Sequence, residues 1–253
     1  MATRKEAAQL APTAPDKWLG LKETSARPLR ITEHGPVRTV VEAVFVCGSS
    51  ALVRQYVIGH PEGSIEVRDR LFNNHRDRML KLVMPLAFAA QRSSAETLYS
   101  AAERRPSENH EERTNQRWVA VRGKQGNKPV YLAVLNTGSF AHSLTESELA
   151  LNVVRSPAYS SFNIDPHDER LNNRFAPRQD QGEHEMRYAL LVGGRFDETR
   201  VSRAAQVLNT PPVWQVYYPQ PEKAERRRRL EVAGSVVIGD PQVVMTSAAV
   251  GIV

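Results

Sequence analysis

The chain has 253 residues, of which 41% are hydrophobic, so it is long enough to bury a core as one large domain or two smaller ones. Its 34 Lys and Arg residues exceed its 28 Asp and Glu residues by six, and four arginines stand together at residues 226–229. A protein that binds nucleic acid more often carries a basic stripe interleaved with aromatic residues. The charge pattern therefore favours an ordinary solvated surface, and we expect no nucleic-acid partner.

Nothing in the sequence favours insertion into a membrane. The first ten residues lack the apolar core of a signal peptide, and no uncharged run approaches the length of a membrane span. The single cysteine, Cys47, excludes an intramolecular disulfide and stands in an apolar segment typical of a buried strand. We expect a soluble protein of a reducing compartment, the cytoplasm, with no membrane partner.

Apolar and polar residues alternate with a period of two along most of the chain, which is typical of β-strands. In the clearest case, residues 64–71, Ile65, Val67 and Leu71 fall on one side and Glu66, Arg68 and Arg70 on the other. We expect strands at residues 42–46, 51–58, 64–71, 78–85, 117–121, 130–135, 148–154, 185–191, 213–218 and 230–238. Turns rich in Gly and Asn separate these segments, so the pattern predicts an all-β fold, a large antiparallel β-sandwich.

Segments without this alternation are interpreted as a helix, loops and a connector. Apolar residues spaced by one helical turn predict a short helix at 199–208, which Asn209 and Pro211 would end. Residues 93–115 and 157–180 have the character of loops, and the second is long enough to be functional or disordered. Residues 1–26 are interpreted as a connector, and residues 27–253 as a single domain.

The densest polar group precedes and enters the strand predicted at 185–191. Asp180, Glu183 and Glu185 stand beside a glycine and a histidine, and hydrolysis of a glycoside usually needs two carboxyl groups. In an extended segment Glu183 and Glu185 share one face and His184 points to the other, although Gly182 permits a bend. A polar loop of this kind is either a ligand contact or merely a turn.

Other kinds of site find less support in the sequence. His167, Asp168 and His184 could bind a metal, but their spacing matches no compact zinc signature, and we expect no metal site. The segment from Gly123 to Gly126 lies between two predicted strands and is interpreted as a hairpin tip, not as a phosphate-binding loop. The sequence contains no Gly-x-Ser-x-Gly motif for a nucleophilic serine. We therefore expect no catalytic residues in this chain.

A series of short segments then shows a resemblance to a known family. The segments are Glu33-His-Gly-Pro-Val-Arg38, residues 67–85, Glu103-Arg-Arg-Pro106 with Gln116-Arg-Trp-Val119, Leu132-Ala-Val-Leu-Asn136, Arg155-Ser-Pro157, Asp180-Gln-Gly-Glu-His184 and Leu208-Asn-Thr-Pro211. In this order they resemble the C-terminal β-sandwich region of the glycoside hydrolase family 38 α-mannosidases. The resemblance runs from about residue 16 to the end of the chain.

The resemblance implies both a function and a partner. Members of the family hydrolyse terminal α-mannosides with retention, using an aspartate nucleophile and a divalent metal, usually zinc, in an N-terminal α/β barrel. We find no such barrel in this sequence, so the chain is expected to be a C-terminal domain or fragment that packs on a catalytic barrel. By itself it is expected to be inactive and to hold no cofactor. One loop of this domain would lie at the rim of the active site and contact the α-mannoside. Its residues are Asp180, Gln181, Glu183 and His184.

The sequence also departs from the family pattern. After Tyr188-Ala-Leu190 it continues with Val192-Gly-Gly194, where the family usually has a Pro-His pair. Residues 240–253 begin where family members enter a further strand, so we expect the sandwich to be incomplete at its C-terminus and residues 248–253 to leave an apolar surface. A stand-alone, non-catalytic β-sandwich that binds carbohydrate or protein therefore remains an alternative.

Overall fold

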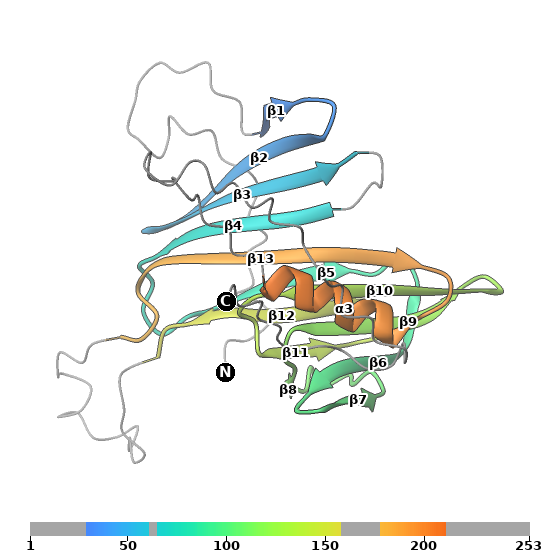
Figure 1. The fold of residues 1–253 in the computed structure, drawn as a ribbon. Coiled ribbons are helices and arrows are strands. Elements are labelled where there is room, and N and C mark those ends of the chain that lie inside the picture. The colour runs from blue at the N-terminus through green and yellow to red at the C-terminus, as the bar shows by residue number, and fades with distance from the viewer. Residues whose placement is uncertain (1–28, 61–64, 158–177, 211–253) are drawn as a thin grey trace, which may run out of the picture.

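The computed structural model describes residues 29–60, 65–157 and 178–210, which form thirteen β-strands and one α-helix (Figure 1). Several sequence predictions fall outside these residues. They are the connector at 1–26, most of the loop at 157–180, the strands at 213–218 and 230–238, the arginines at 226–229 and the C-terminal stretch at 240–253. No helix within the described ranges is long and apolar enough to cross a membrane.

Nine strands form one antiparallel sheet in the spatial order β1-β2-β3-β4-β13-β10-β9-β6-β7. Strand β13 lies between β4 and β10, so it joins the N-terminal strands to the centre of the sheet. The strands are β1 (Leu29–His34), β2 (Arg38–Cys47), β3 (Ser50–Gly59), β4 (Ile65–Asn73), β6 (Ala89–Thr97), β7 (Ser100–Arg104), β9 (Trp118–Gln125), β10 (Lys128–Asn136) and β13 (Gly182–Gly193).

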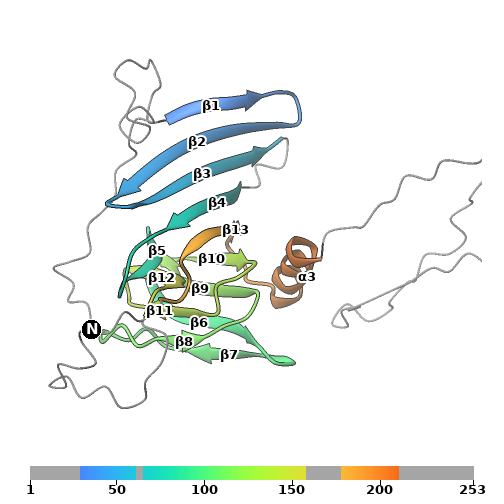
Figure 2. The ribbon, with the colours of Figure 1, turned by 90° about the vertical axis from the view of Figure 1, so that its left-hand side faces the viewer.

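A second antiparallel sheet of four strands has the order β5-β12-β11-β8. Its strands are β5 (Met79–Pro85), β8 (Arg113–Thr114), β11 (Ala141–Leu144) and β12 (Glu148–Arg155). Figure 2 shows this sheet on one side of the large sheet and the helix on the other side. We call the side of the large sheet that faces the small sheet the inner face, and the opposite side the outer face.

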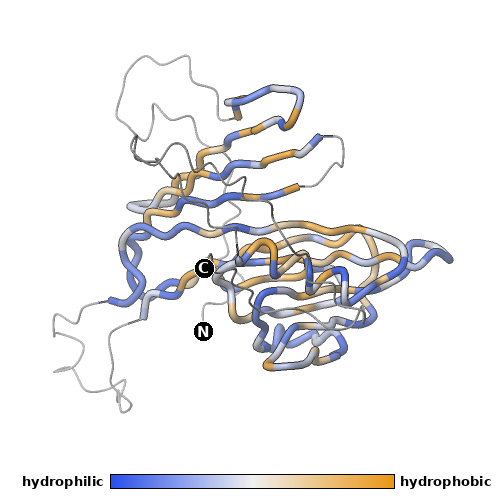
Figure 3. The backbone as a smooth tube through the Cα atoms, in the orientation of Figure 1, coloured by the Kyte–Doolittle hydropathy of each residue, from blue (hydrophilic) through white to orange (hydrophobic). Residues whose placement is uncertain are grey.

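The main hydrophobic core lies between the two sheets. It contains side chains that are completely removed from solvent, such as Val119, Val134 and Leu151, together with Tyr188 of β13 and Val67 of β4. The backbone is accordingly most hydrophobic along the central strands, while the beginning of β13 is hydrophilic (Figure 3). Because successive side chains of a strand point to opposite faces, the alternating residues of both sheets meet in this core.

The helix α3 (Glu198–Asn209) covers the outer face of β9, β10 and β13. The Asp197 carboxylate caps its first turn by accepting a hydrogen bond from the backbone N–H of Arg200 (3.1 Å). Its buried residues, Val201, Ala205 and Leu208, recur at the spacing of one helix face and pack with Trp118 and Tyr131 of the sheet. The predicted helix at 199–208 is confirmed.

The predicted all-β sandwich is confirmed, but some local expectations were wrong. The supposed loop at 93–115 contains the end of β6 and all of β7 and β8. This stretch is rich in Ala, Ser and charged residues, so it lacks the alternation of apolar and polar residues on which the prediction relied. Gly123 lies within β9, and the hairpin turn is formed by Gly126 and Asn127. Strands β1 and β11 were not predicted.

Candidate functional site

The loop predicted to contact a ligand lies at one end of the large sheet, where three connections meet. Residues 178–182 approach residues 73–77, which follow β4, and these in turn contact the β2–β3 turn at residues 48–50. We call this group of three segments the loop junction. It draws together residues about a hundred positions apart in the sequence, because β13 pairs with β4 from Gly182 onward.

The backbone of Asp180 organises the loop junction. This residue has a φ of 50°, in the left-handed region that few residues other than glycine adopt without cost, and Asp is one of those that tolerate it. Its carbonyl oxygen accepts hydrogen bonds from Asn73 Nδ2 (2.6 Å) and His184 Nε2 (2.9 Å). Gln181 Nε2 donates to the carbonyl of His75 (3.4 Å). Both hydrogen bonds to Asp180 therefore involve its backbone.

A second set of contacts supports the junction from the β2–β3 turn. The Ser50 hydroxyl is hydrogen-bonded to His75 Nδ1 and accepts the backbone N–H of Asn74 (2.8 Å). The Arg178 guanidinium donates to Asp77 (2.9 Å). These bonds fix the positions of the turns, so the junction presents Asp180 and Gln181 to solvent on a hydrogen-bonded framework.

The side chains of the predicted residues do not all lie on one face of the sheet. Glu183 is exposed on the outer face and forms an ion pair with Arg70 of the adjacent strand. His184 is half-buried, points to the inner face, and donates its Nε2 proton to the Asp180 carbonyl. The alternation expected for Glu183, His184 and Glu185 is thus present from the first residues of β13.

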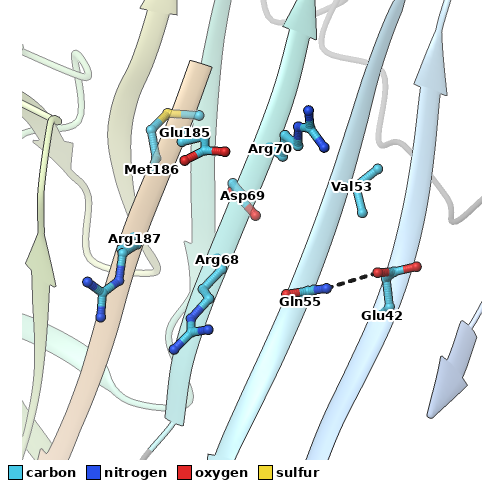
Figure 4. A pocket seen from close by; sticks show the side chains of 9 residues that line it. All are labelled: Glu42, Val53, Gln55, Arg68, Asp69, Arg70, Glu185, Met186 and Arg187. Atoms are coloured by element: carbon cyan, nitrogen blue, oxygen red, sulfur yellow. Dashed lines mark hydrogen bonds between the residues drawn. The ribbon is translucent and has the colours of Figure 1, made fainter. Parts of the chain in front are cut away.

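Beyond Glu183 the outer face of β2, β3, β4 and β13 is hollowed into a groove of about 380 Å³. Figure 4 shows its side chains in two rows that cross the four strands. One row contains, in strand order, Glu42, Gln55, Arg68 and Arg187, and the other contains Val53, Arg70 and Glu185. The lining also includes Asp69 and Met186, whose side chains take part in an ion pair and in the core between the sheets. We call this hollow the polar groove.

Ion pairs hold the charged side chains of the polar groove in place. Glu66 accepts hydrogen bonds from Arg68 (2.9 Å) and from Arg187 (2.7 Å). Partial burial by itself raises the pKa of Glu66, but the two guanidiniums outweigh this effect and the pKa is lowered. At the other side, Glu42 is bonded to Arg30 and accepts a hydrogen bond from Gln55 Nε2 (3.0 Å).

The remaining pair connects the polar groove to the predicted loop. Arg70 Nε donates to Glu183, and this hydrogen bond raises the pKa of the Arg70 guanidinium. Glu185 lies directly opposite Arg70 on the neighbouring strand. Glu183 therefore belongs both to the loop identified from the sequence and to the border of the polar groove.

The sequence also raised the question of a metal site, which concerns the His, Cys, Asp and Glu side chains of residues 29–60, 65–157 and 178–210. No group of three or more His, Cys, Asp or Glu side chains there is placed to hold a metal ion. His167 and Asp168, which the sequence suggested as partners of His184, lie outside the described residues.

The sequence prediction missed most of the polar groove. The alternation of residues along each strand places Arg68, Arg70 and Arg187 at outward positions. Charged residues at outward positions are also typical of any solvated sheet surface. Their convergence depends on the pairing of β4 with β13, which are distant in the sequence. The register that places Arg70 opposite Glu185 is a property of the tertiary structure.

These observations define a two-sheet antiparallel β-sandwich domain with a helix on the outer face of its larger sheet. Residues 12–168 match the family model described as the glycosyl hydrolases family 38 C-terminal domain. Because this match spans more than half of the chain, the chain belongs to glycosyl hydrolase family 38. A search of curated protein sequences gave no match.

Solved structures support the assignment of the fold. The chain is similar to an α-mannosidase from Enterococcus faecalis V583, with 13% sequence identity and a TM-score of 0.57. It is also similar to a glycosyl hydrolase family 38 protein from Enterococcus faecalis, with 14% identity and a TM-score of 0.54. Each alignment covers 71% of this chain and 24% of the other protein, so the chain spans about a quarter of the length of these relatives.

Proposed function

We propose that this chain is the β domain of a retaining α-mannosidase that cleaves terminal α-mannosides in carbohydrate catabolism in the cytoplasm. The observation that supports the proposal is the family match over residues 12–168, combined with structural alignments that cover 24% of the related proteins. A domain of this size within a larger enzyme needs a catalytic partner. That partner is a catalytic α/β barrel, which supplies the aspartate nucleophile and the zinc ion.

The loop junction is the part of the domain that we propose for the rim of the active site. Asp180, Gln181 and Glu183 are exposed at its surface, and carboxylate and amide groups can each hydrogen-bond sugar hydroxyls. His184, the fourth residue of the predicted rim, would act by holding the Asp180 carbonyl and hence the shape of the loop. The domain would thus position the mannoside, while the barrel performs bond cleavage.

Activity measurements test the proposed division of labour. The purified chain, with and without zinc, is expected to show no hydrolysis of an aryl α-mannoside. Addition of a family 38 catalytic domain, expressed as a separate polypeptide, is expected to restore turnover. Hydrolysis by the chain alone above the level of an Asp180→Ala, Glu183→Ala double variant would contradict the proposal.

The proposed rim is tested in the reconstituted complex. Glu183→Gln removes the charge but keeps the size of the side chain, and it should raise KM for the aryl α-mannoside with a smaller effect on kcat. Glu111→Gln is a matched control, because Glu111 is an exposed carboxylate of similar character that is paired with Arg113. If both variants and the native chain had equal kinetic constants, the loop junction would not be part of the active-site rim.

A further inference from the structure

The polar groove is large enough for a small ligand, and its charges are balanced. Its volume of about 380 Å³ lies at the small end of the range for ligand pockets, which is about 300–1,000 Å³. Asp69 in the lining is paired with Arg54 on the inner face, and apart from this pair four guanidiniums and four carboxylates line or border the groove, so the formal charges cancel. The guanidiniums belong to Arg30, Arg68, Arg70 and Arg187, and the carboxylates to Glu42, Glu66, Glu183 and Glu185.

Much of the hydrogen-bonding capacity of these groups is left for a ligand. A guanidinium offers five N–H donors, and among the described residues Arg70 uses its Nε on Glu183 and Arg187 uses its Nε on Glu66. The side chains of Arg70 and Arg187 are 67% and 41% exposed, so their remaining N–H groups are accessible. Opposite Arg70, the exposed Glu185 provides acceptors at the distance of neighbouring strands, about 5 Å.

Helix α3 and an ion pair bound the polar groove on its two sides. Helix α3 packs near Ala189 and Leu191, which follow Arg187 on the same face of β13, so the groove begins where the helix cover ends. The Arg30–Glu42 pair borders the opposite side. Val53, at the β3 end of the row that also contains Arg70 and Glu185, provides a small apolar surface against which a C–H face can pack.

We propose that the polar groove binds a neutral saccharide directly, as a second carbohydrate site that takes no part in bond cleavage. A phosphate or carboxylate would gain little from a site whose charges cancel, because each guanidinium already faces a glutamate. A sugar, by contrast, presents hydroxyls that accept from arginine and donate to glutamate within one ring, and a C–H face that packs on Val53. This inference goes beyond the proposed α-mannosidase function and does not require the catalytic barrel.

Binding to the full chain alone tests the inference. Ligand-observed NMR and titration calorimetry with methyl α-mannoside, an α-linked mannobiose and inorganic phosphate are expected to show saturable binding of at least one saccharide. This binding should be little affected by raising the salt concentration, whereas phosphate should not saturate the chain. Absence of saturable binding of both saccharides would overturn the proposal, as would binding of phosphate in their place.

Two variants locate the binding. Arg70→Gln and Glu185→Gln remove opposite charges from facing positions, and each is expected to weaken saccharide binding about tenfold or more. Arg92→Gln is the matched control, because Arg92 is an exposed arginine paired with Glu103 on another part of the sheet. Circular dichroism establishes that each variant is folded, and Glu185→Gln is nearly isosteric. Binding that survives both groove variants would place the sugar elsewhere and contradict the proposal.

Failure of this experiment is distinguishable from failure of the proposed function. Saccharide binding is measured without any catalytic domain, whereas the proposed function is measured as turnover in its presence. A reconstituted complex that is active although the chain alone binds no sugar would preserve the α-mannosidase assignment and overturn the polar groove as a site.

Discussion

Arg54 of β3 and Asp69 of β4 form a bidentate ion pair on the inner face of the large sheet, with N–O distances of 2.7 and 2.6 Å. The Asp69 side chain is 2% exposed, so its charge is compensated almost entirely by Arg54. Burial by itself lowers the pKa of Arg54, but the Asp69 carboxylate outweighs this and the pKa is raised. Asp69 also contributes to the raised pKa of the buried Tyr188, after burial itself.

We expect Arg54→Met to destabilise the protein by about 3–5 kcal/mol, because it leaves the buried Asp69 carboxylate without its partner. The double variant Arg54→Met, Asp69→Leu should recover most of this loss. Urea unfolding measures both effects. Arg38→Met breaks the exposed Arg38–Glu33 pair and serves as a control with little expected change. If the double variant were as unstable as the single one, the pair would not act as a unit.

His142 of β11 makes the stability of the sandwich sensitive to acid. Its side chain is 1% exposed, its Nδ1 lies 3.1 Å from Asn115 Oδ1, and burial, assisted by the charge of Arg113, lowers its pKa to about 4. A histidine whose pKa is lowered on folding stabilises the native state above its unfolded pKa of about 6.5. This stability is lost as the pH falls from about 6.5 toward 4.

The loss attributable to His142 should amount to at most about 3 kcal/mol at pH 4. Denaturant titrations of the native chain and of His142→Gln, compared at pH 7.5 and at pH 4.5, measure it. The variant should show a weaker pH dependence, since Gln does not titrate. Parallel pH profiles for the two proteins would show that His142 is not responsible.

Gly123 is required where β9 passes close to Ala89 and Phe88. A Cβ atom added there would lie 2.2 Å from the Ala89 carbonyl oxygen and 2.6 Å from a ring carbon of Phe88. Gly123→Ala should therefore cost about 2 kcal/mol or more, through displacement of the neighbouring strand β6. Gly138→Ala is the control, because the space around its Cβ is open. Equal melting temperatures for the two variants would refute this interpretation.

Asp180 offers a test of whether its backbone or its side chain matters for the loop junction. Because its φ is 50°, Asp180→Gly should be tolerated, whereas Asp180→Val should cost about 1–2 kcal/mol. Asp180→Asn should resemble the native chain. Thermal unfolding of the three variants gives the comparison. A glycine variant as unstable as the valine variant would instead assign the stabilising role to the carboxylate.

The alternating pattern of residues 64–71 predicted a strand, and β4 begins at Ile65 and runs through the described part of this segment. The same pattern placed Glu66, Arg68 and Arg70 outward, which the structure confirms, because a strand turns successive side chains to opposite faces. The ordered family segments also led from the sequence to the family that the match over residues 12–168 identifies. In the candidate site, the exposed positions of Asp180, Gln181 and Glu183 follow from their polar character alone.

What the sequence by itself determined was local: the strand periodicity, the helix predicted at 199–208 and the polar loop before β13. The tertiary structure decided which strands are neighbours, and thereby joined Glu183 to Arg70, Arg54 to Asp69 and the two rows of the polar groove. The reason is that strand periodicity records which face a residue occupies, whereas register and partner depend on packing between segments far apart in the chain. A single charged residue at an inward position, such as Asp69, is explained only when its partner on the next strand is known.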